Sequence, residues 1–166
     1  MNRAPTSPEI SPSPPERPHI DISVGQQFLR LSQGANLLFE APISSATKGI
    51  GYTEGSHQTP IGRFFIREKI GDGAPLHTAF LGRRPTGIWS PTSTCHDSIL
   101  TRIMWLDGLD EKNANTYRRY IYLHGTHAED SIGQPASLGC IRLRNADMLR
   151  LFDLTPLCTT VTIHES

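Results

Sequence analysis

The chain lacks long hydrophobic runs, an excess of charge and a large set of cysteines. No apolar segment approaches the ~18 residues that span a bilayer, so no membrane-spanning segment is expected. Sixteen Lys and Arg residues balance sixteen Asp and Glu residues, which argues against a nucleic-acid-binding surface or an anionic-membrane patch. The three cysteines, Cys95, Cys140 and Cys158, cannot all pair, and a domain of this size needs no disulfide framework. We therefore expect reduced thiols.

The start of the chain is rich in proline and lacks an apolar stretch followed by a small-residue cleavage site, so it does not resemble a secretory signal. Proline there can join neither helices nor sheet ladders, and residues 1–18 are predicted to form a disordered tail. Residues 19–166 are enough for one domain with a substantial core. If Met1 is the native start, a cytoplasmic location is expected.

The hydrophobic pattern predicts a mainly β fold with one or two short helices. Alternating or β-branched segments indicate strands, and glycine, proline or polar residues separate them. Strands are expected at 20–24, 28–31, 37–39, 64–66, 79–81, 99–106, 120–124 and 159–163. The segment 71–91 should be irregular, with short strands such as the one at 79–81, and 48–59 should form a loop near the functional site. Apolar residues at helical spacing predict a helix over 145–154, with Asn145 as its cap.

Cys140 and His124 are the residues that best explain a chemical function. A thiol of ordinary pKa, ~8.5, is mostly protonated at neutral pH, and a nearby imidazole can take its proton. Gly139 removes a side chain where a carbonyl oxygen must approach, and it lets consecutive N–H groups of Gly139 and Cys140 form an oxyanion hole. The alternatives are a core cysteine and a histidine that merely ends a strand.

The sequence around this pair resembles a known family. The segments RYIYLHGT, at 119–126, and IGQPASLGCIR, at 132–142, resemble the signature of the L,D-transpeptidase (YkuD-type) catalytic domain. The segment TPIGRF, at 59–64, and the strand at 99–106 also fit, and the match runs from about Ile20 to Ile163. One departure is Leu138, where many members carry histidine or another polar residue.

The resemblance implies a YkuD-like β-sandwich and a peptidoglycan tetrapeptide as substrate. Cys140 would attack the carbonyl of the third residue of the stem, and His124 would protonate the departing D-alanine. The backbone carbonyl of Gly125 would orient the imidazole ring. The resulting thioester would pass to water, giving L,D-carboxypeptidase activity, or to an amine, giving a 3→3 cross-link or a lipoprotein linkage. Carbapenem-type inhibitors are plausible ligands of the same thiol.

Residues near the pair are candidates for substrate binding. Arg142 follows Cys140 by two positions, so in a strand it shares the face of the thiol and could hold a substrate carboxylate. Its alternative is an ion pair with Asp147 or Asp153. Ser137 could face the substrate or only shape a turn. Three residues of the glycine-rich loop could line the donor groove: Tyr52, His57 and Thr59.

We expect no metal and no other cofactor. The histidines that could be ligands, His57, His77, His96 and His127, do not follow a compact zinc-binding spacing, even with Cys140 added. Cys95 and Cys158 are expected to be spectators.

A cytoplasmic enzyme would meet soluble peptide fragments rather than polymeric wall, which favours release of D-alanine from recycled tetrapeptides. Cross-linking in the envelope is the alternative activity. Two other classes stay open: a non-catalytic binding module, supported only by Leu138, and a zinc-dependent amidase.

Overall fold

The computed structural model describes residues 14–93 and 98–166 and is mainly β, as predicted. In these residues it has one α-helix, α1 (Asn145–Leu154), and two 3₁₀ turns, η1 (Glu111–Asn113) and η2 (Glu129–Ser131). The strands of the described chain are β1 (Pro18–Ser23), β2 (Phe28–Gln33), β3 (Asn36–Pro42), β4 (Gly62–Ile70), β5 (Thr78–Leu81), β6 (Arg84–Ile88), β7 (Ile99–Gly108), β8 (Tyr122–Thr126), β9 (Ile141–Leu143) and β10 (Thr160–His164).

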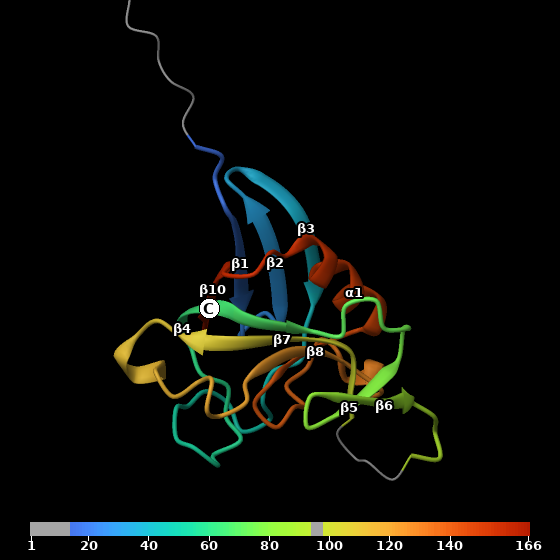
Figure 1. Ribbon diagram of the computed structural model, residues 1–166. Coiled ribbons are helices and arrows are strands. Elements are labelled where there is room, and N and C mark those ends of the chain that lie inside the picture. Colours follow the sequence, from blue (N-terminus) through green and yellow to red (C-terminus); the bar gives the residue numbers. More distant parts are fainter. Residues whose placement is uncertain (1–13, 94–97) are drawn as a thin grey trace, which may run out of the picture.

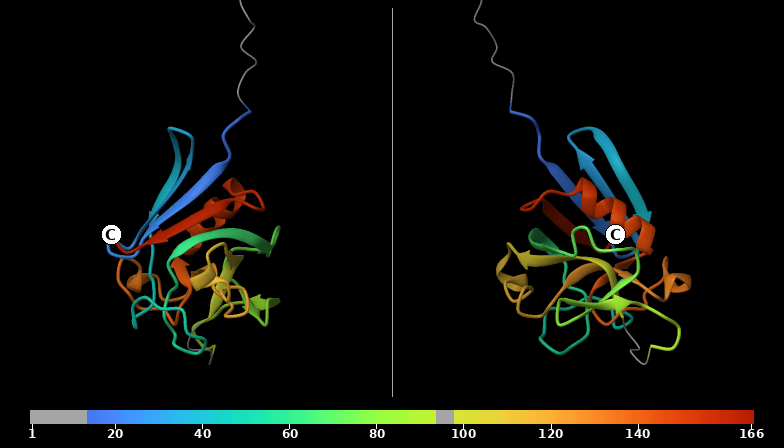
Figure 2. Two further views of the ribbon diagram at one scale, coloured as in Figure 1. Left: turned by 90° about the vertical axis from the view of Figure 1, so that its left-hand side faces the viewer. Right: turned by 45° about the vertical axis from the view of Figure 1, so that its right-hand side comes forward.

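The strands form one continuous, curled sheet. Its order is β3-β2-β1-β10-β4-β7-β5-β6, and β8 pairs with both β7 and β9. In Figure 1, β1, β2 and β3 run up and down the view, whereas β4 and β7 cross below them. The sandwich-like layering therefore arises from a sheet that bends over itself. Two strands from opposite ends of the chain, β1 and β10, lie side by side and pair in parallel (Figure 2).

Two hydrophobic clusters lie on opposite faces of β7 and β8. The larger one contains Leu106 and Leu123 together with residues of β1, β2, β4, β9 and α1. The smaller one contains Phe80, Ile103, Trp105 and Tyr122. Because successive side chains of a strand point to opposite faces, each central strand contributes to both clusters.

The structure adds β6 and β9 to the strands that were located from the sequence, and it shifts several strand boundaries. The segment 71–91 holds β6 as well as β5, and β9 follows Cys140 directly. The strand expected from Tyr120 begins only at Tyr122, because Tyr120 has φ +57°, far from the extended backbone of a regular strand.

Asn145 does not cap the helix, so that prediction was wrong. The capping position is Arg144, and Asn145 is the first helical residue. Its side chain donates to the carbonyl of Thr126 at 2.7 Å and accepts from Thr101 Oγ1 at 2.7 Å. Asn145 therefore ties α1 to β7 and β8, which a buried amide can do because it has both donors and acceptors.

Two of the sequence predictions concern the start of the chain and the loop before β7. Residues 1–13 of the predicted tail lie outside the described residues, as do Cys95 and His96. The first strand begins at Pro18, at the end of the range assigned to the tail. Within the described residues, no helix combines the length and the apolar character needed to cross a membrane.

Candidate active site

Strands β8 and β9 bring His124 and Cys140 to one face of the sheet. The two strands pair in parallel, with Leu123 beside Ile141, and Cys140 immediately precedes β9. The backbone N–H of Tyr122 lies 3.4 Å from Cys140 Sγ, and the thiol packs against the smaller cluster. Tyr122 and His124 are two positions apart in β8, so their side chains share that face.

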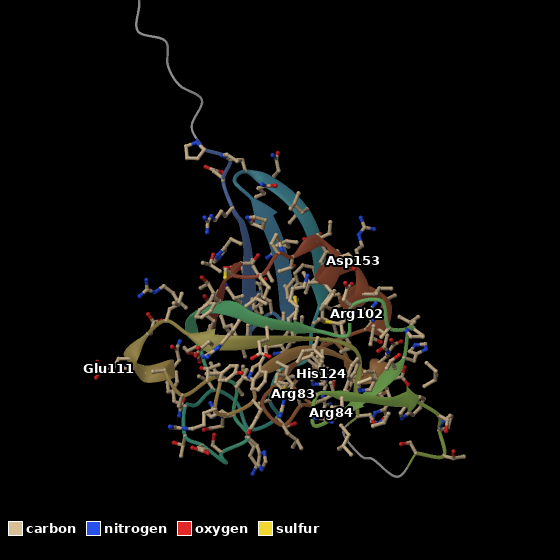
Figure 3. The ribbon with its side chains drawn as sticks, viewed as in Figure 1. Arg83, Arg84, Arg102, Glu111, His124 and Asp153 are labelled. Carbon is tan, nitrogen blue, oxygen red and sulfur yellow. The ribbon has the colours of Figure 1, made fainter. Side chains whose placement is uncertain are left out.

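The His124 ring is buried and oriented by its own strand. Its Nδ1 lies 2.6 Å from the carbonyl oxygen of Gly125, the contact that the family resemblance implied, and only 2% of the residue is exposed. A carbonyl oxygen can only accept, so Nδ1 carries the hydrogen and Nε2 of the neutral ring keeps its lone pair. Such an imidazole is prepared to accept a proton at Nε2. The position of His124 on the ribbon is labelled in Figure 3.

Gly125 is required beside this histidine because the helix approaches closely. A Cβ atom at position 125 would lie 2.3 Å from Asn145 Oδ1 and 2.8 Å from the carbonyl oxygen of Leu100. No side chain fits there without moving the helix or β7. The glycine therefore lets the end of β8, including the carbonyl that orients His124, pack directly against Asn145.

The Cys140 thiol is partly exposed at the surface of the smaller cluster. Its Sγ donates to the carbonyl oxygen of Tyr120 at 3.4 Å and accepts from the N–H of Tyr122. The N–H directed at sulfur favours the thiolate, whereas the hydrogen bond to the Tyr120 carbonyl favours the protonated thiol. Access to solvent is a further requirement for a nucleophile, and the thiol meets it.

The turn before the thiol is held by side chains that the sequence had suggested for substrate binding. Gly139 has φ +124°, a conformation suited to glycine. Its carbonyl accepts from Thr59 Oγ1 at 3.0 Å, and its N–H donates to Ser137 Oγ at 3.2 Å. The Ser137 hydroxyl in turn donates to the Cys140 carbonyl at 2.6 Å.

These contacts correct three expectations. Thr59 and Ser137 are buried and support the turn, so neither lines a groove. The N–H of Gly139 is directed at Ser137 rather than toward an oxyanion. Tyr52 lies in the predicted loop, where its carbonyl accepts from Asn115 Nδ2 at 2.8 Å.

Arg142 lies on the predicted face but is buried. It pairs with His124 in the register of β8 and β9, so it shares the face of the imidazole. Only 6% of the residue is exposed, and its Nη1 donates to the carbonyl of Ala136 at 3.2 Å. The guanidinium is better placed to support the segment before Cys140 than to meet a substrate from solvent.

Arg119 is a site residue that the sequence analysis missed. Its guanidinium donates to the carbonyls of Gly51 at 3.1 Å and Gln58 at 2.7 Å, and to Ser56 Oγ at 3.3 Å. Burial lowers the pKa of Arg119, and attraction to Cys140 opposes that shift. Arg119 therefore fixes the loop beside the turn of Cys140 and places a positive charge near the sulfur. In the sequence, the adjacent arginines Arg118 and Arg119, just before β8, could have indicated a positive charge near the site.

An aromatic wall, also missed, borders the thiol. We use this term for Trp105, Tyr117, Tyr120 and Tyr122. Trp105 stacks on Tyr117 with ring centroids 4.0 Å apart, lies 5.6 Å from Tyr120 and meets Tyr122 edge-on at 5.3 Å. Three tyrosines within residues 117–122 of the sequence could have indicated this aromatic wall. Burial raises the pKa of Tyr122, so this phenol stays neutral at neutral pH.

Two cavities are lined by residues that neighbour Cys140 or His124 in the chain. The one near the thiol, of about 210 Å³, is lined by Tyr120, Ile121 and Leu138 together with Glu54, Gly55, His57, Arg118 and Arg119. The other, of about 440 Å³, includes Thr126, two positions beyond His124, and the carboxylates of Glu129 and Asp130. The expected loop at 48–59 does reach the site, through Glu54 and His57.

The remaining candidate ligands do not gather around the pair. Among residues 14–93 and 98–166, no three His, Cys, Asp or Glu side chains form a group that could hold a metal ion. Cys158 is exposed and lies beside Pro156 and Thr160, next to β10.

Comparison with known proteins agrees with this geometry. The family model of the L,D-transpeptidase catalytic domain (YkuD) matches residues 17–163. The YkuD protein of Bacillus subtilis is 28% identical over 146 residues, which cover 88% of this chain and 65% of that protein. The YbiS protein of Escherichia coli is 28% identical over 160 residues, covering 89% of this chain and 45% of YbiS. The chain therefore spans less than two thirds of either relative.

Solved structures share the fold at low sequence identity. The L,D-transpeptidase from Xylanimonas cellulosilytica is 19% identical with a TM-score of 0.59, covering 92% of this chain and 63% of that chain. The L,D-transpeptidase LdtMt1 in complex with imipenem is 18% identical with a TM-score of 0.56, covering 90% and 59%. The family model covers nearly the whole of this sequence, and the chain belongs to the L,D-transpeptidase family.

Proposed function

We propose that this protein is a cysteine L,D-carboxypeptidase that releases the terminal D-alanine from soluble peptidoglycan tetrapeptides. The observation that carries the proposal is the partly exposed Cys140 thiol on the same face as His124, whose Nδ1 is held by Gly125. Membership of the L,D-transpeptidase family supplies the substrate class. A cytoplasmic role in recycling is part of the proposal, and fractionation of cells with detection of the native protein tests that part.

The reaction proceeds by acyl transfer in two steps. His124 Nε2 takes the thiol proton, and the thiolate attacks the carbonyl carbon of the third residue, forming an S–C bond. The oxyanion is stabilised by the Cys140 N–H. The C–N bond to D-alanine breaks, and His124 returns the proton to the departing amine. Water, deprotonated by His124, then attacks the thioester, and the released thiolate regains the proton.

Transpeptidation is the second candidate, and the larger cavity favours it. The carboxylates of Glu129 and Asp130 at that cavity could attract the ammonium group of an amine acceptor. An amine that attacks the thioester before water would give a cross-linked or exchanged product. The choice between the two activities depends only on the acceptor, so both use the same thioester on Cys140.

The decisive experiment is a product assay. The purified protein is incubated with a free stem tetrapeptide, with and without an added D-amino acid, and the products are identified by mass spectrometry. Tripeptide and D-alanine in both reactions support the carboxypeptidase. Exclusively exchanged or cross-linked products would replace it with the transpeptidase.

The same assay should include Cys140→Ala and a carbapenem. Imipenem is expected to add its mass to the wild-type protein and not to Cys140→Ala, because the thiolate opens the β-lactam ring and keeps the acyl group. If the wild type neither cleaves the tetrapeptide nor acquires the adduct, the binding-module alternative stands. Loss of cleavage with a chelator would instead support the zinc-dependent amidase.

A further inference from the structure

The turn of the β5–β6 hairpin places Arg83 over the aromatic wall. The guanidinium carbon lies 4.9 Å from the Trp105 ring centroid and 5.2 Å from that of Tyr120. Nη1 donates to the Tyr122 hydroxyl at 3.3 Å. Figure 3 labels both Arg83 and His124, and the hydrogen bond to Tyr122 brings Arg83 to the strand that carries His124.

Tyr122 connects this guanidinium to the nucleophile. Its hydroxyl accepts from Arg83, while its backbone N–H lies 3.4 Å from Cys140 Sγ. Arg83 and the sulfur therefore lie at the two ends of one tyrosine, on the same face of the sheet.

Arg83 differs from the other arginines of this region in having donors to spare. Arg119 gives its guanidinium to two backbone carbonyls and a hydroxyl of the adjoining loop. Arg67, at the far end of the wall over Tyr117, is paired with Asp107 at 2.7 Å. For Arg83, the contacts that the described residues provide are aromatic faces and one phenol. A guanidinium has five N–H donors, so most remain for a ligand.

We propose that Arg83 binds the C-terminal carboxylate of the peptide donor and so restricts cleavage to the last peptide bond. This inference rests on the proposed function. A planar guanidinium binds a carboxylate through two parallel hydrogen bonds, and the aromatic faces hold it in place for that contact. The carboxylate belongs to the departing residue, so binding it keeps the scissile carbonyl at Cys140. A peptide that is amidated or extended at its C-terminus has no carboxylate at this position, so the guanidinium of Arg83 lacks its hydrogen-bond acceptor.

The first experiment compares a free-acid tetrapeptide with the same peptide ending in an amide. The wild type should show kcat/KM at least ~10-fold higher for the free acid, as expected for a hydrogen bond to a charged group. Arg83→Gln should lower kcat/KM for the acid by that factor and leave the amide within ~2-fold. Arg84→Gln, which removes a charge from the next residue of the hairpin, is the matched control and should keep the preference. Arg83→Lys should retain part of it because it keeps the charge without the planar fork.

The second experiment needs no turnover of the peptide. Iodoacetate and iodoacetamide alkylate the same thiol but differ in charge, and peptide mapping isolates the reaction at Cys140. Arg83→Gln should slow alkylation by iodoacetate relative to iodoacetamide several-fold, whereas Arg84→Gln should not. An unchanged iodoacetamide rate shows that the thiol environment is intact.

The two experiments separate the inference from the proposed function. The alkylation ratio is the rate with iodoacetate divided by the rate with iodoacetamide. If the wild type does not release D-alanine but this ratio falls in Arg83→Gln, the proposed carboxypeptidase function fails and the carboxylate site stands. If D-alanine is released and Arg83→Gln keeps both the acid preference and the alkylation ratio, the function stands and the inference is overturned. If Arg83→Gln does not fold, the same measurements are made on Arg83→Lys. A preference for the free-acid peptide that is unchanged in Arg83→Lys contradicts recognition through two hydrogen bonds.

Discussion

At the scale of single residues, His124 is prepared for its role by one hydrogen bond. The carbonyl of Gly125 fixes the hydrogen on Nδ1 and leaves Nε2 basic, so no acidic side chain is needed to orient the ring. A backbone carbonyl is a neutral acceptor, and it stabilises the imidazolium less than a carboxylate would. Proton transfer back to the leaving amine is correspondingly easier.

The variant His124→Gln tests this residue. We expect kcat/KM for the tetrapeptide to fall ~10²- to 10⁴-fold because the general base is removed, and alkylation of Cys140 by iodoacetamide to require higher pH. Rates are measured from D-alanine release and from mass spectrometry at several pH values. The control His19→Gln changes a residue of β1 and should keep both properties. An unchanged alkylation profile in His124→Gln would show that the imidazole does not act on the thiol.

Residue patterns singled out the candidate thiol and imidazole, but they did not reveal the contacts that support them. Cys140, His124 and Gly139 are recognisable because their chemistry requires those residue types. Thr59, Ser137 and Arg142 looked available to a substrate, yet each is buried and donates a hydrogen bond to a nearby carbonyl. A polar side chain next to a candidate catalytic residue can bind substrate or support the local backbone. Only its burial in the folded protein distinguishes these two roles.

At the scale of elements, the 3₁₀ turn η1 depends on one carboxylate. Asp110, just before the turn, accepts from the backbone N–H of Arg63 at 2.7 Å and from its guanidinium at 2.6 Å. These hydrogen bonds lower the pKa of Asp110. The contact attaches the loop after β7 to the start of β4.

The variant Asp110→Asn should therefore lose stability in a pH-dependent way. The folded-state pKa lies below the unfolded value of ~3.9, so the carboxylate stabilises the fold above that pH and the contribution is lost as the pH falls through the folded-state pKa. Denaturant unfolding at several pH values should show a deficit at neutral pH that shrinks toward pH ~2. Glu111→Gln removes a charge from the same turn and should change stability by less than ~0.5 kcal/mol. A deficit in Asp110→Asn that is constant with pH would contradict the assignment.

Helices and strands could be predicted from the sequence where the hydrophobic periodicity was strong. They could not be predicted where a segment becomes a strand only by pairing with another strand. The alternation of β1, the apolar run of β7 and the helical spacing of α1 are visible in the sequence. The short strands β6 and β9 are not, because their residues become strands only by pairing with β5 and β8. The role of Asn145 was also hidden, since its partners Thr126 and Thr101 come from other strands.

At the scale of the whole molecule, the curled sheet has a rigid centre and two exposed ends. Strand β7 pairs with β4 and β5 along one edge and with β8 along the other. Among the strands of the described residues, β6 pairs only with β5, and all of its residues are exposed. Pro85, which has no N–H, interrupts that edge and discourages pairing with another chain.

Hydrogen exchange should follow this arrangement. We expect amides of β4, β7 and β8 to exchange slowest and those of β6 fastest among the strands, because local opening of the hairpin exposes little apolar surface. Exchange measured by mass spectrometry on the intact protein tests this expectation. Protection of β6 equal to that of β7 would mean that the hairpin opens only with the rest of the sheet.

The sequence alone determined the mainly β class and the family, and it singled out the candidate thiol and imidazole. Those features depend on local periodicity and on side-chain chemistry, which neighbouring residues reveal. Tertiary structure decided that Arg119 fixes a loop, that Arg142 is buried and that Arg83 lies over the aromatic wall near the thiol. These placements depend on strand register between segments far apart in the chain, where a shift of one residue would turn each side chain to the other face.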